Sequence, residues 1–287
     1  MSQLRDIKDR IESVKKTQKI TQAMKMVAAA KLKRATMKMN DATPYLQQLD
    51  NIMRDLVARV EPDNLPKLIT ENEGTKNAII ILTGDRGLCG GFNSNIIKFA
   101  KETLSKRNHD TELFLIGTKG IQTFTKEKWS IIKKEEGYHE TLSVTGLETF
   151  LSPLIEGFLK EKYNKVTVIY NEFKSVSNNQ VIEKTLMPVS LPKSEENNVT
   201  GSDYFYEPGK ETVLTELLME YIIDQLYIAL LENQTAEQSA RMTAMDSATD
   251  NAGEMLRDLT LIYNRKRQAQ ITSEISEIVA GSESLVA

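Results

Sequence analysis

Cysteine and histidine are scarce in this 287-residue sequence, which contains one cysteine and two histidines. The single cysteine, Cys89, cannot form a disulfide within the chain; it fits a reducing compartment and is most simply a small buried hydrophobic residue. His109 and His139 lie in polar surroundings, so a metal site built from His and Cys ligands is not expected. The sequence has no G-x-S-x-G motif. With so few histidines and cysteines, it also lacks the residues for a catalytic triad or for a metal ion that activates water. We therefore expect no catalytic residue, no metal and no cofactor.

Long hydrophobic runs and export signals are also missing. No apolar run approaches 18 residues, which is the length that predicts a membrane-spanning helix. The N-terminus carries no signal peptide. We expect a chain that neither spans a membrane nor is exported, although it could still dock on a membrane protein.

Glycine and proline avoid both ends of the chain. No glycine occurs from Met1 to Glu73, the last 79 residues contain no proline, and Gly253 is the only glycine between Lys210 and Ala280. Nothing interrupts a C-terminal helix from Gly209 to Gly281, which would be roughly 100 Å long and would need partners outside its own fold. Alanines at every fourth position predict a ridge that another helix can approach closely: Ala236, Ala240, Ala244, Ala248 and Ala252.

The N-terminal region has the heptad pattern of a coiled coil. Its two interleaved series are Ile7, Val14, Thr21, Ala28, Ala35, Ala42, Leu49, Leu56 and Leu4, Ile11, Gln18, Lys25, Leu32, Met39, Leu46, Met53. The three polar exceptions, Gln18, Thr21 and Lys25, are consecutive in this seam, which we interpret as a local change of partner. Pro44 lies inside the pattern and should kink or divide the helix. We predict that the two terminal helices pair with each other.

Charges of the two signs are unevenly distributed. The net charge is −3, yet residues 1–40 hold eleven Lys or Arg against three acidic residues, a local excess of +8. Such a basic helix is either a solvated face or a surface for acidic protein partners. Binding to nucleic acid is less well supported, because no aromatic residue that could stack on bases occurs before Tyr45.

Proline and glycine, the residues typical of turns, are concentrated in the middle of the chain, as expected of a compact domain. All seven prolines lie from Pro44 to Pro208, and twelve of the fourteen glycines lie from Gly74 to Gly209. The predicted strands are residues 77–84, 112–117, 165–173 and 181–192, the last at an edge because Pro188 interrupts it; the predicted helices are 93–106, 118–126 and 147–163. This alternation predicts a small Rossmann-like sheet. We therefore predict a Rossmann-like α/β domain of residues 61–208 inserted into a coiled-coil shaft of residues 1–60 and 209–287.

The most enzyme-like sequence is TGDRGLCGGFN, residues 83–93, which joins the first predicted strand to the first predicted helix. Glycine-rich loops at this position can bind a phosphate through backbone amides. The spacing matches neither G-x-G-x-x-G nor G-x-x-x-x-G-K-[ST], and no lysine follows the glycines to reach a phosphate. A tight turn with a close approach to a neighbouring helix is therefore favoured over nucleotide binding.

Five motifs give the chain a resemblance to the gamma subunit of F-type ATP synthases over its whole length. They are KKTQKITQAMKMVAAAK (Lys15 to Lys31), DRGLCGGFN (Asp85 to Asn93), DYFYEP (Asp203 to Pro208), ARMTAMDSATDNAG (Ala240 to Gly253) and YNRKRQAQITSEISEIVAGS (Tyr263 to Ser282). One departure is Ser282 after Gly281, where the family usually has alanine; the helix end tolerates this hydroxyl.

The resemblance implies a central rotor shaft. The two terminal helices would form a long antiparallel coiled coil inside a ring of three alpha and three beta subunits, with the inserted domain at the foot beside the epsilon subunit and the membrane c ring. Proton-driven rotation would couple to ATP synthesis or hydrolysis at the beta-subunit sites and would regulate proton flow. The chain would be bacterial, since it lacks a transit peptide and the plastid insertion, and peripheral on the cytoplasmic face of the cell membrane.

The same resemblance implies partner-contact residues. Met24 and Lys25, at the break in the seam, would face the catalytic ring. Arg267, Gln268, Thr272 and Glu274 would face a beta-subunit loop, and Tyr204, Tyr206 and Glu207 would meet the c ring and epsilon. For each residue an ordinary solvated or packing role is the alternative.

Two other classes stay open at this point. A dehydrogenase-like enzyme would bind a dinucleotide at Gly84–Gly91. A cytoskeletal or nucleic-acid-binding coiled-coil protein would associate with itself or with DNA, and retention on DNA would depend on salt.

Overall fold

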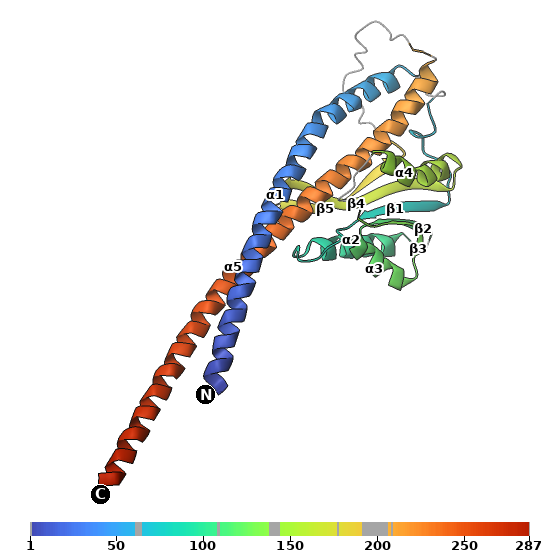
Figure 1. The fold of residues 1–287 in the computed structure, drawn as a ribbon. Coiled ribbons are helices and arrows are strands. Elements are labelled where there is room, and N and C mark those ends of the chain that lie inside the picture. Colours follow the sequence, from blue (N-terminus) through green and yellow to red (C-terminus); the bar gives the residue numbers. More distant parts are fainter. Residues whose placement is uncertain are drawn as a thin grey trace. The chain divides into compact units, whose positions relative to one another are not determined.

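The computed structural model describes residues 2–60, 65–107, 110–137, 144–176, 178–190, 206–207 and 209–286. The chain divides into two compact units: the first contains Met1–Ala29 and Arg241–Ala287, and the second contains Ala30–Ala240. Two long helices, α1 (Ser2–Ala58) and α5 (Lys210–Val286), contribute to both units (Figure 1). The predicted fold class, a long antiparallel helix pair with an inserted Rossmann-like α/β domain, is confirmed.

The heptad pattern of α1 is confirmed in detail. All sixteen predicted seam positions, from Leu4 to Met53 and Leu56, are buried or half-buried. Pro44 does not divide the helix, although the ribbon of α1 curves in this part (Figure 1). Pro44 and Asn40 are both exposed, so water can satisfy the carbonyl group that loses its intrahelical bond.

The second unit contains a five-stranded sheet in the order β3-β2-β1-β4-β5. The strands are β1 (Lys76–Leu82), β2 (Thr111–Ile116), β3 (Ser130–Glu135), β4 (Tyr163–Ser175) and β5 (Asn178–Met187). The first four are parallel and β5 is antiparallel to β4. The four parallel strands follow the order 3-2-1-4 of a doubly wound sheet, and β5 adds an antiparallel edge.

The predicted elements of this unit are present, with one omission. Besides the predicted strands, the helices are α2 (Phe92–Lys106), α3 (Thr118–Phe124) with a 3-10 turn at Thr125–Glu127, and α4 (Val144–Leu159). The predicted edge position of β5 is confirmed, but the strand ends at Met187 and does not continue past Pro188 as predicted. The strand β3 was not predicted, because its sequence SIIKKE is short and its side chains alternate only between exposed and half-buried.

Helices cover both faces of the sheet, and alternate residues of β1 point to opposite faces. Ile80 and Leu82 lie in one apolar cluster with α4 and with the parts of α1 and α5 that belong to this unit. Ile79 and Ile81 lie in a second cluster with α2 and α3. The continuous apolar run of β1 is thus explained by burial on both faces.

A buried carboxylate ties together the amino-terminal ends of three parallel strands. Only 6% of the Glu112 side chain is exposed; its Oε1 lies 2.9 Å from Lys76 Nζ, and its Oε2 lies 2.6 Å from both Lys162 Nζ and the Tyr163 hydroxyl. Burial by itself raises the pKa of Glu112, but the hydrogen bonds from Lys162, Tyr163 and Lys76 more than offset it and lower the pKa to about 2. The ionised form of Glu112 is therefore part of the folded state.

A turn that has no room for a side chain follows β2 at Gly117. Its φ is +101°, and a Cβ atom there would lie 2.0 Å from the carbonyl oxygen of Thr83. Thr83 is fully buried, and its hydroxyl accepts a hydrogen bond from the Gly120 amide over 2.9 Å. Glycine is required at this position both by the backbone angle and by the space.

Candidate partner-contact surfaces

Three pairs of residues, in antiparallel order, line the contact between the two helices of the first unit. Gln18 lies beside Gly253. Thr249 Oγ1 donates to Thr21 Oγ1 over 2.8 Å. Lys25 forms an ion pair with Asp246. The three polar seam residues thus face α5, and our interpretation of the break as a change of partner is wrong for these residues.

The alanine ridge of α5 is only partly a packing surface. Ala236 and Ala252 are buried, whereas Ala240, Ala244 and Ala248 are half-buried. In a helix of 3.6 residues per turn, each step of four residues rotates by about 40°, so five alanines cannot share one face. The seam of α5 instead passes through Met245, Thr249 and Ala252, which the i+4 spacing did not reveal.

Large apolar side chains remain exposed on α1 beside this seam. Ile20, Met26 and Val27 are 60%, 60% and 57% exposed. Between residues 4 and 27, all of which the structure describes, Met24 is the one side chain off the predicted seam that is not exposed. Met24 therefore borders the seam, next to an apolar surface that the chain itself leaves open.

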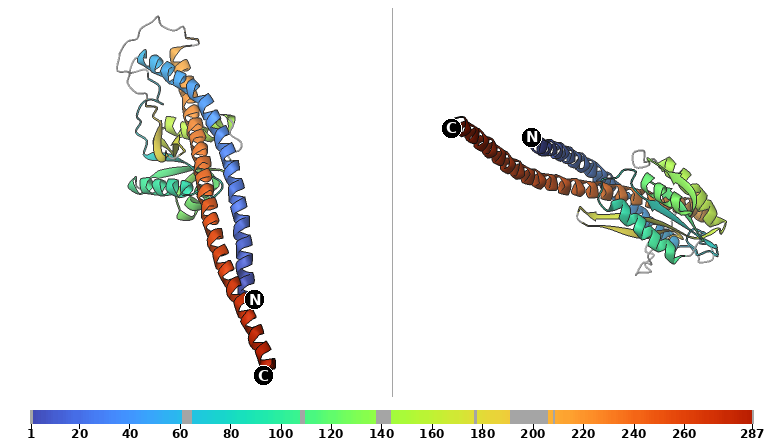
Figure 2. Two further views of the ribbon diagram at one scale, coloured as in Figure 1. Left: turned by 90° about the vertical axis from the view of Figure 1, so that its left-hand side faces the viewer. Right: turned by 90° about the horizontal axis from the view of Figure 1, so that it is seen from below.

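The last part of α5 extends past the N-terminal end of α1 (Figure 2). When the register of these three pairs is continued to the start of α1, the first residues of α1 lie opposite about residue 269 of α5. All side chains from residue 271 to residue 280 are exposed. The large apolar ones are Ile271, Ile275, Ile278 and Val279. Their spacing of three and four residues makes a stripe that a partner protein could cover.

The four contact residues predicted in this segment are all exposed: Arg267, Gln268, Thr272 and Glu274. Two hydrogen bonds of this group are local to α5. Thr272 Oγ1 donates to the carbonyl oxygen of Gln268 over 3.0 Å, and Glu274 accepts from Gln270 over 2.8 Å. The side chains of this group are thus placed where a partner can reach them.

The residues predicted for the foot are only partly described. Tyr204 lies outside the described residues. Tyr206 is half-buried against the apolar core, with the Lys210 ammonium 5.3 Å from its ring centroid, so packing accounts for much of its role. Glu207 is exposed.

The glycine-rich loop is organised by its own side chains. Asn93 Oδ1 accepts from the Gly84 amide over 2.8 Å. A Cβ atom on Gly84 would lie 3.0 Å from the Glu237 carboxyl carbon of α5, so the loop approaches this helix closely. An amide that is already bonded, next to a buried carboxylate, disfavours a phosphate at this point. The structural interpretation of the loop is supported over nucleotide binding.

Asp85, in the same loop, binds the start of α3. Its Oδ1 accepts from the Thr118 amide over 3.0 Å, from the Thr118 hydroxyl over 2.9 Å and from the Gly137 amide over 3.2 Å. A carboxylate at a helix N-terminus satisfies free amides and interacts favourably with the helix dipole. The loop therefore joins three separate segments of the sheet domain.

Replacing Asp85 with alanine should lower the free energy of unfolding by about 1 to 2 kcal/mol, because an N-terminal cap is lost. Asp85→Asn keeps an acceptor oxygen and should lose less. Urea denaturation followed by the fluorescence of Trp129, which packs against the α2–α3 side of the sheet, measures both. Equal midpoints for the parent and the alanine variant would show that the cap does not stabilise this domain.

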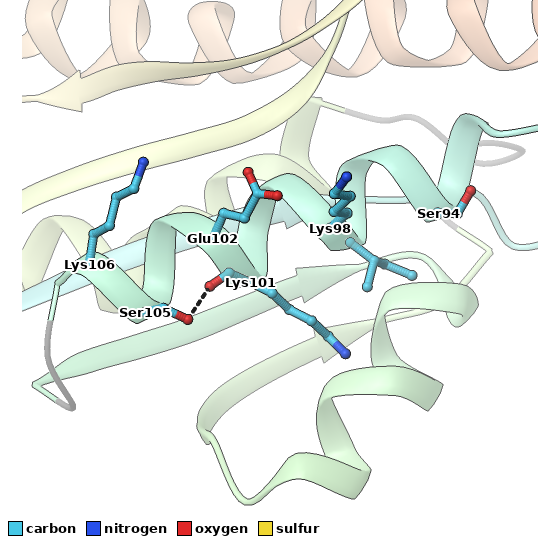
Figure 3. Close-up of a pocket in the computed structure, with 7 residues that line it drawn as sticks. Ser94, Lys98, Lys101, Glu102, Ser105 and Lys106 are labelled. Carbon is cyan, nitrogen blue, oxygen red and sulfur yellow. Dashed lines mark hydrogen bonds between the residues drawn. The ribbon is translucent and has the colours of Figure 1, made fainter.

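A surface hollow of about 830 Å³ lies along α2, and Figure 3 shows the side chains that line it. It is lined by Ser94, Ile97, Lys98, Lys101, Glu102, Ser105 and Lys106. All seven residues come from one helix, and Lys101 is paired with Glu127. No second element encloses a small molecule here, so this hollow does not have the form of a ligand site.

Neither a metal site nor a membrane span is found in the part of the chain that the structure describes. Groups of three or more His, Cys, Asp or Glu side chains able to hold a metal ion do not occur there. His109 and His139 both lie outside the described residues. The described helices include none that is long and apolar enough to cross a membrane.

Comparison with known proteins gives consistent results. A family model described as ATP synthase matches residues 3–285. The ATP synthase gamma chain of Geobacter sp. strain M21 is 43% identical over 288 residues, covering 99% of both chains. That of Pelagibacter ubique is 41% identical over 292 residues, covering 99% of this chain and all of the relative.

Two solved structures have a similar fold. One is a chain in the Euglena gracilis mitochondrial ATP synthase, described as OSCP/F1/c-ring in rotational state 3, with a TM-score of 0.70 and 17% identity, covering 99% of this chain and 95% of that one. The other is a chain in the central stalk and c ring of the Tetrahymena thermophila mitochondrial ATP synthase, with a TM-score of 0.61 and 22% identity, covering 80% and 99%. At these identities the likeness concerns the fold.

Proposed function

The chain belongs to the ATP synthase gamma chain family, and we propose that it is the central rotor shaft of a bacterial, proton-transporting F-type ATP synthase. In this role it turns with the membrane c ring and changes the nucleotide affinities of the beta-subunit sites. Proton flow is thereby coupled to ATP synthesis or hydrolysis, and the shaft regulates both. Catalysis takes place on the beta subunits, and this chain supplies no catalytic residue.

The observation that carries the proposal is the end of α5, where every side chain from residue 271 to residue 280 is exposed. A free helix with four large apolar side chains in water is unfavourable. A sleeve formed by the alpha and beta subunits would cover this stripe. Arg267, Gln268, Thr272 and Glu274 would then contact a beta-subunit loop from the same segment.

A second proposed contact with the ring lies around Met24. The half-buried Met24 borders the exposed side chains of Ile20 and Val27, and the basic charge of the N-terminal segment suits acidic groups of the ring. Lys25 also belongs to this proposed contact surface. Its ammonium pairs with Asp246, but 35% of its side chain is exposed. A partner carboxylate can share that ammonium.

The foot completes the rotor. Glu207, Tyr206 and Tyr204 would meet the epsilon subunit and the c ring, and the chain would be held at the cytoplasmic face of the cell membrane through these partners. We propose that the functional parts of the chain are a shaft of residues 1–60 and 209–287 and a Rossmann-like domain of residues 61–208.

Co-purification tests the proposal. An affinity tag on this chain should recover alpha, beta, epsilon and c subunits in fixed ratio from detergent-solubilised membranes. A matched chain that ends at residue 269 removes the exposed stripe of α5 and should bind the alpha–beta ring less tightly while it retains the c ring. Recovery of the tagged chain without any of these subunits would refute the rotor assignment.

A charge at Met24 should disturb coupling more than folding. Met24→Lys places a cation on the rotating surface, and acidic groups of the ring would bind it differently at different rotor angles, which deepens one resting state. We expect a smaller number of protons pumped per ATP hydrolysed in inverted membrane vesicles, with a stability change of less than about 1 kcal/mol.

Met24→Leu, which keeps an apolar side chain of similar size, is the control and should pump as the parent does. The comparison requires vesicles that carry equal amounts of assembled complex. If Met24→Lys assembles and pumps like the parent, Met24 does not contact the ring; if it fails to assemble, Met24 belongs to the helix seam.

A further inference from the structure

Three consecutive layers of the predicted seam of α1 in the first unit are polar, and two of them face a polar side chain of α5. They form what we call the polar section, which consists of three pairs: Gln18–Gly253, Thr21–Thr249 and Lys25–Asp246. We propose that the polar section is a weak point of the helix pair, which opens there before it opens at the adjoining seam of residues 28–35.

The first argument is the loss of apolar burial. On one side of the polar section the seam of α1 continues with Ala28, Leu32 and Ala35, which are buried, and on the other side with the apolar residues Val14 and Ile11. The side chains of the polar section are only half-buried. Its layers therefore have fewer apolar side chains than the seam at residues 28–35, although Met245 and Ala252 of α5 stay buried beside them.

The second argument is that both helices contain residues here that weaken a helix. Gly253 is the only glycine between Lys210 and Ala280, and glycine is the weakest helix former apart from proline. A threonine of each helix lies within bonding distance of a carbonyl of its own helix. Thr21 Oγ1 donates to the Gln18 carbonyl over 3.0 Å, and Thr249 Oγ1, 2.7 Å from the Met245 carbonyl, can donate its one proton either there or to Thr21 Oγ1. Such bonds destabilise and bend helices.

The third argument is that the ion pair does not compensate. The Lys25 and Asp246 side chains are 35% and 48% exposed, so water and salt compete with their attraction. When the pair separates, both groups can be hydrated where they stand. The polar section thus combines weak side-chain contacts with weak helix backbones at the same three layers.

Hydrogen exchange on the full-length chain tests this inference. Amides of residues 18–25 and 246–253 should exchange faster than those of residues 28–35, by about tenfold. Gly253→Ala should slow exchange in the polar section by about fivefold, since it raises helix propensity. The added methyl group fits, because it meets only the end of the flexible Gln18 side chain, at 3.1 Å.

Making the seam apolar is the decisive change. Lys25→Leu with Asp246→Leu should slow exchange of residues 18–25 by about tenfold, as apolar contacts replace the ion pair. The matched control is Lys19→Leu with Asp250→Leu, two exposed positions off the seam, which should alter exchange by less than about twofold. The proposal is overturned if residues 18–25 of the parent are as protected as residues 28–35, or if the seam variant exchanges no more slowly than its control.

Discussion

Replacing Gly117 with alanine should lower the free energy of unfolding of the sheet domain by about 3 to 5 kcal/mol, the largest effect we expect from a single methyl group. Two costs combine at this position. The φ of +101° is strained for any residue with a side chain, and the new Cβ atom would lie 2.0 Å from the Thr83 carbonyl oxygen. The carbonyl belongs to the backbone that follows β1 and cannot move aside. The Trp129 fluorescence midpoint in urea measures this loss.

Gly137→Ala is the matched control for this prediction. Gly137 also has a positive φ, +69°, but nothing lies within 4 Å of the position that a Cβ atom would take. Only the backbone cost remains, about 1 kcal/mol. Similar midpoints for the two variants would show that the clash with Thr83 is relieved at little cost.

Replacing Glu112 with glutamine should destabilise the sheet domain by about 2 kcal/mol at neutral pH, since hydrogen bonds from charged donors are lost. Lys76 and Lys162 are 42% and 45% exposed, so water partly compensates both ammonium groups. This keeps the loss below that of a fully buried pair. Urea denaturation at pH 7 measures the difference.

The effect of Glu112 should depend on pH in a defined direction. The pKa of Glu112 is lowered in the folded state to about 2, from an ordinary value of 4.5. Its contribution is therefore complete above pH 4.5 and is lost as the pH falls towards 2. The stability difference between the parent and Glu112→Gln should shrink over this range.

Glu156→Gln is the control for Glu112→Gln. Glu156 pairs with Lys160 on the surface, where the two side chains are 63% and 76% exposed, and the substitution should change stability by less than about 0.5 kcal/mol. A constant difference between the parent and Glu112→Gln from pH 7 to pH 3 would contradict the assigned role of the carboxylate.

The helix pair and four of the five strands could be predicted from the sequence because each follows from a hydrophobic pattern. The heptads of α1 placed its seam correctly, and the apolar run of β1 correctly indicated a strand buried on both faces. The strand β3 has no such pattern, since an edge strand buries only part of one face.

The partner of each polar seam residue could not be predicted from α1 alone. Gln18, Thr21 and Lys25 break the heptads, but whether they face α5 depends on what α5 places opposite them. The residues opposite them are Asp246, Thr249 and Gly253. This pairing could be recognised only once the register of the two helices was known. The contact roles of Arg267, Gln268, Thr272 and Glu274 stay predictions, because an exposed side chain does not identify its partner.

The central claim is that this chain rotates inside its complex, and rotation can be observed directly. The complex should carry Lys98→Cys, at an exposed position on α2 (Figure 3), with the buried Cys89 replaced by serine. The alpha–beta ring is fixed to a surface, and a rod is attached to the new cysteine. On addition of ATP the rod should turn continuously in one direction. A complex that hydrolyses ATP while the attached rod does not turn would contradict the account.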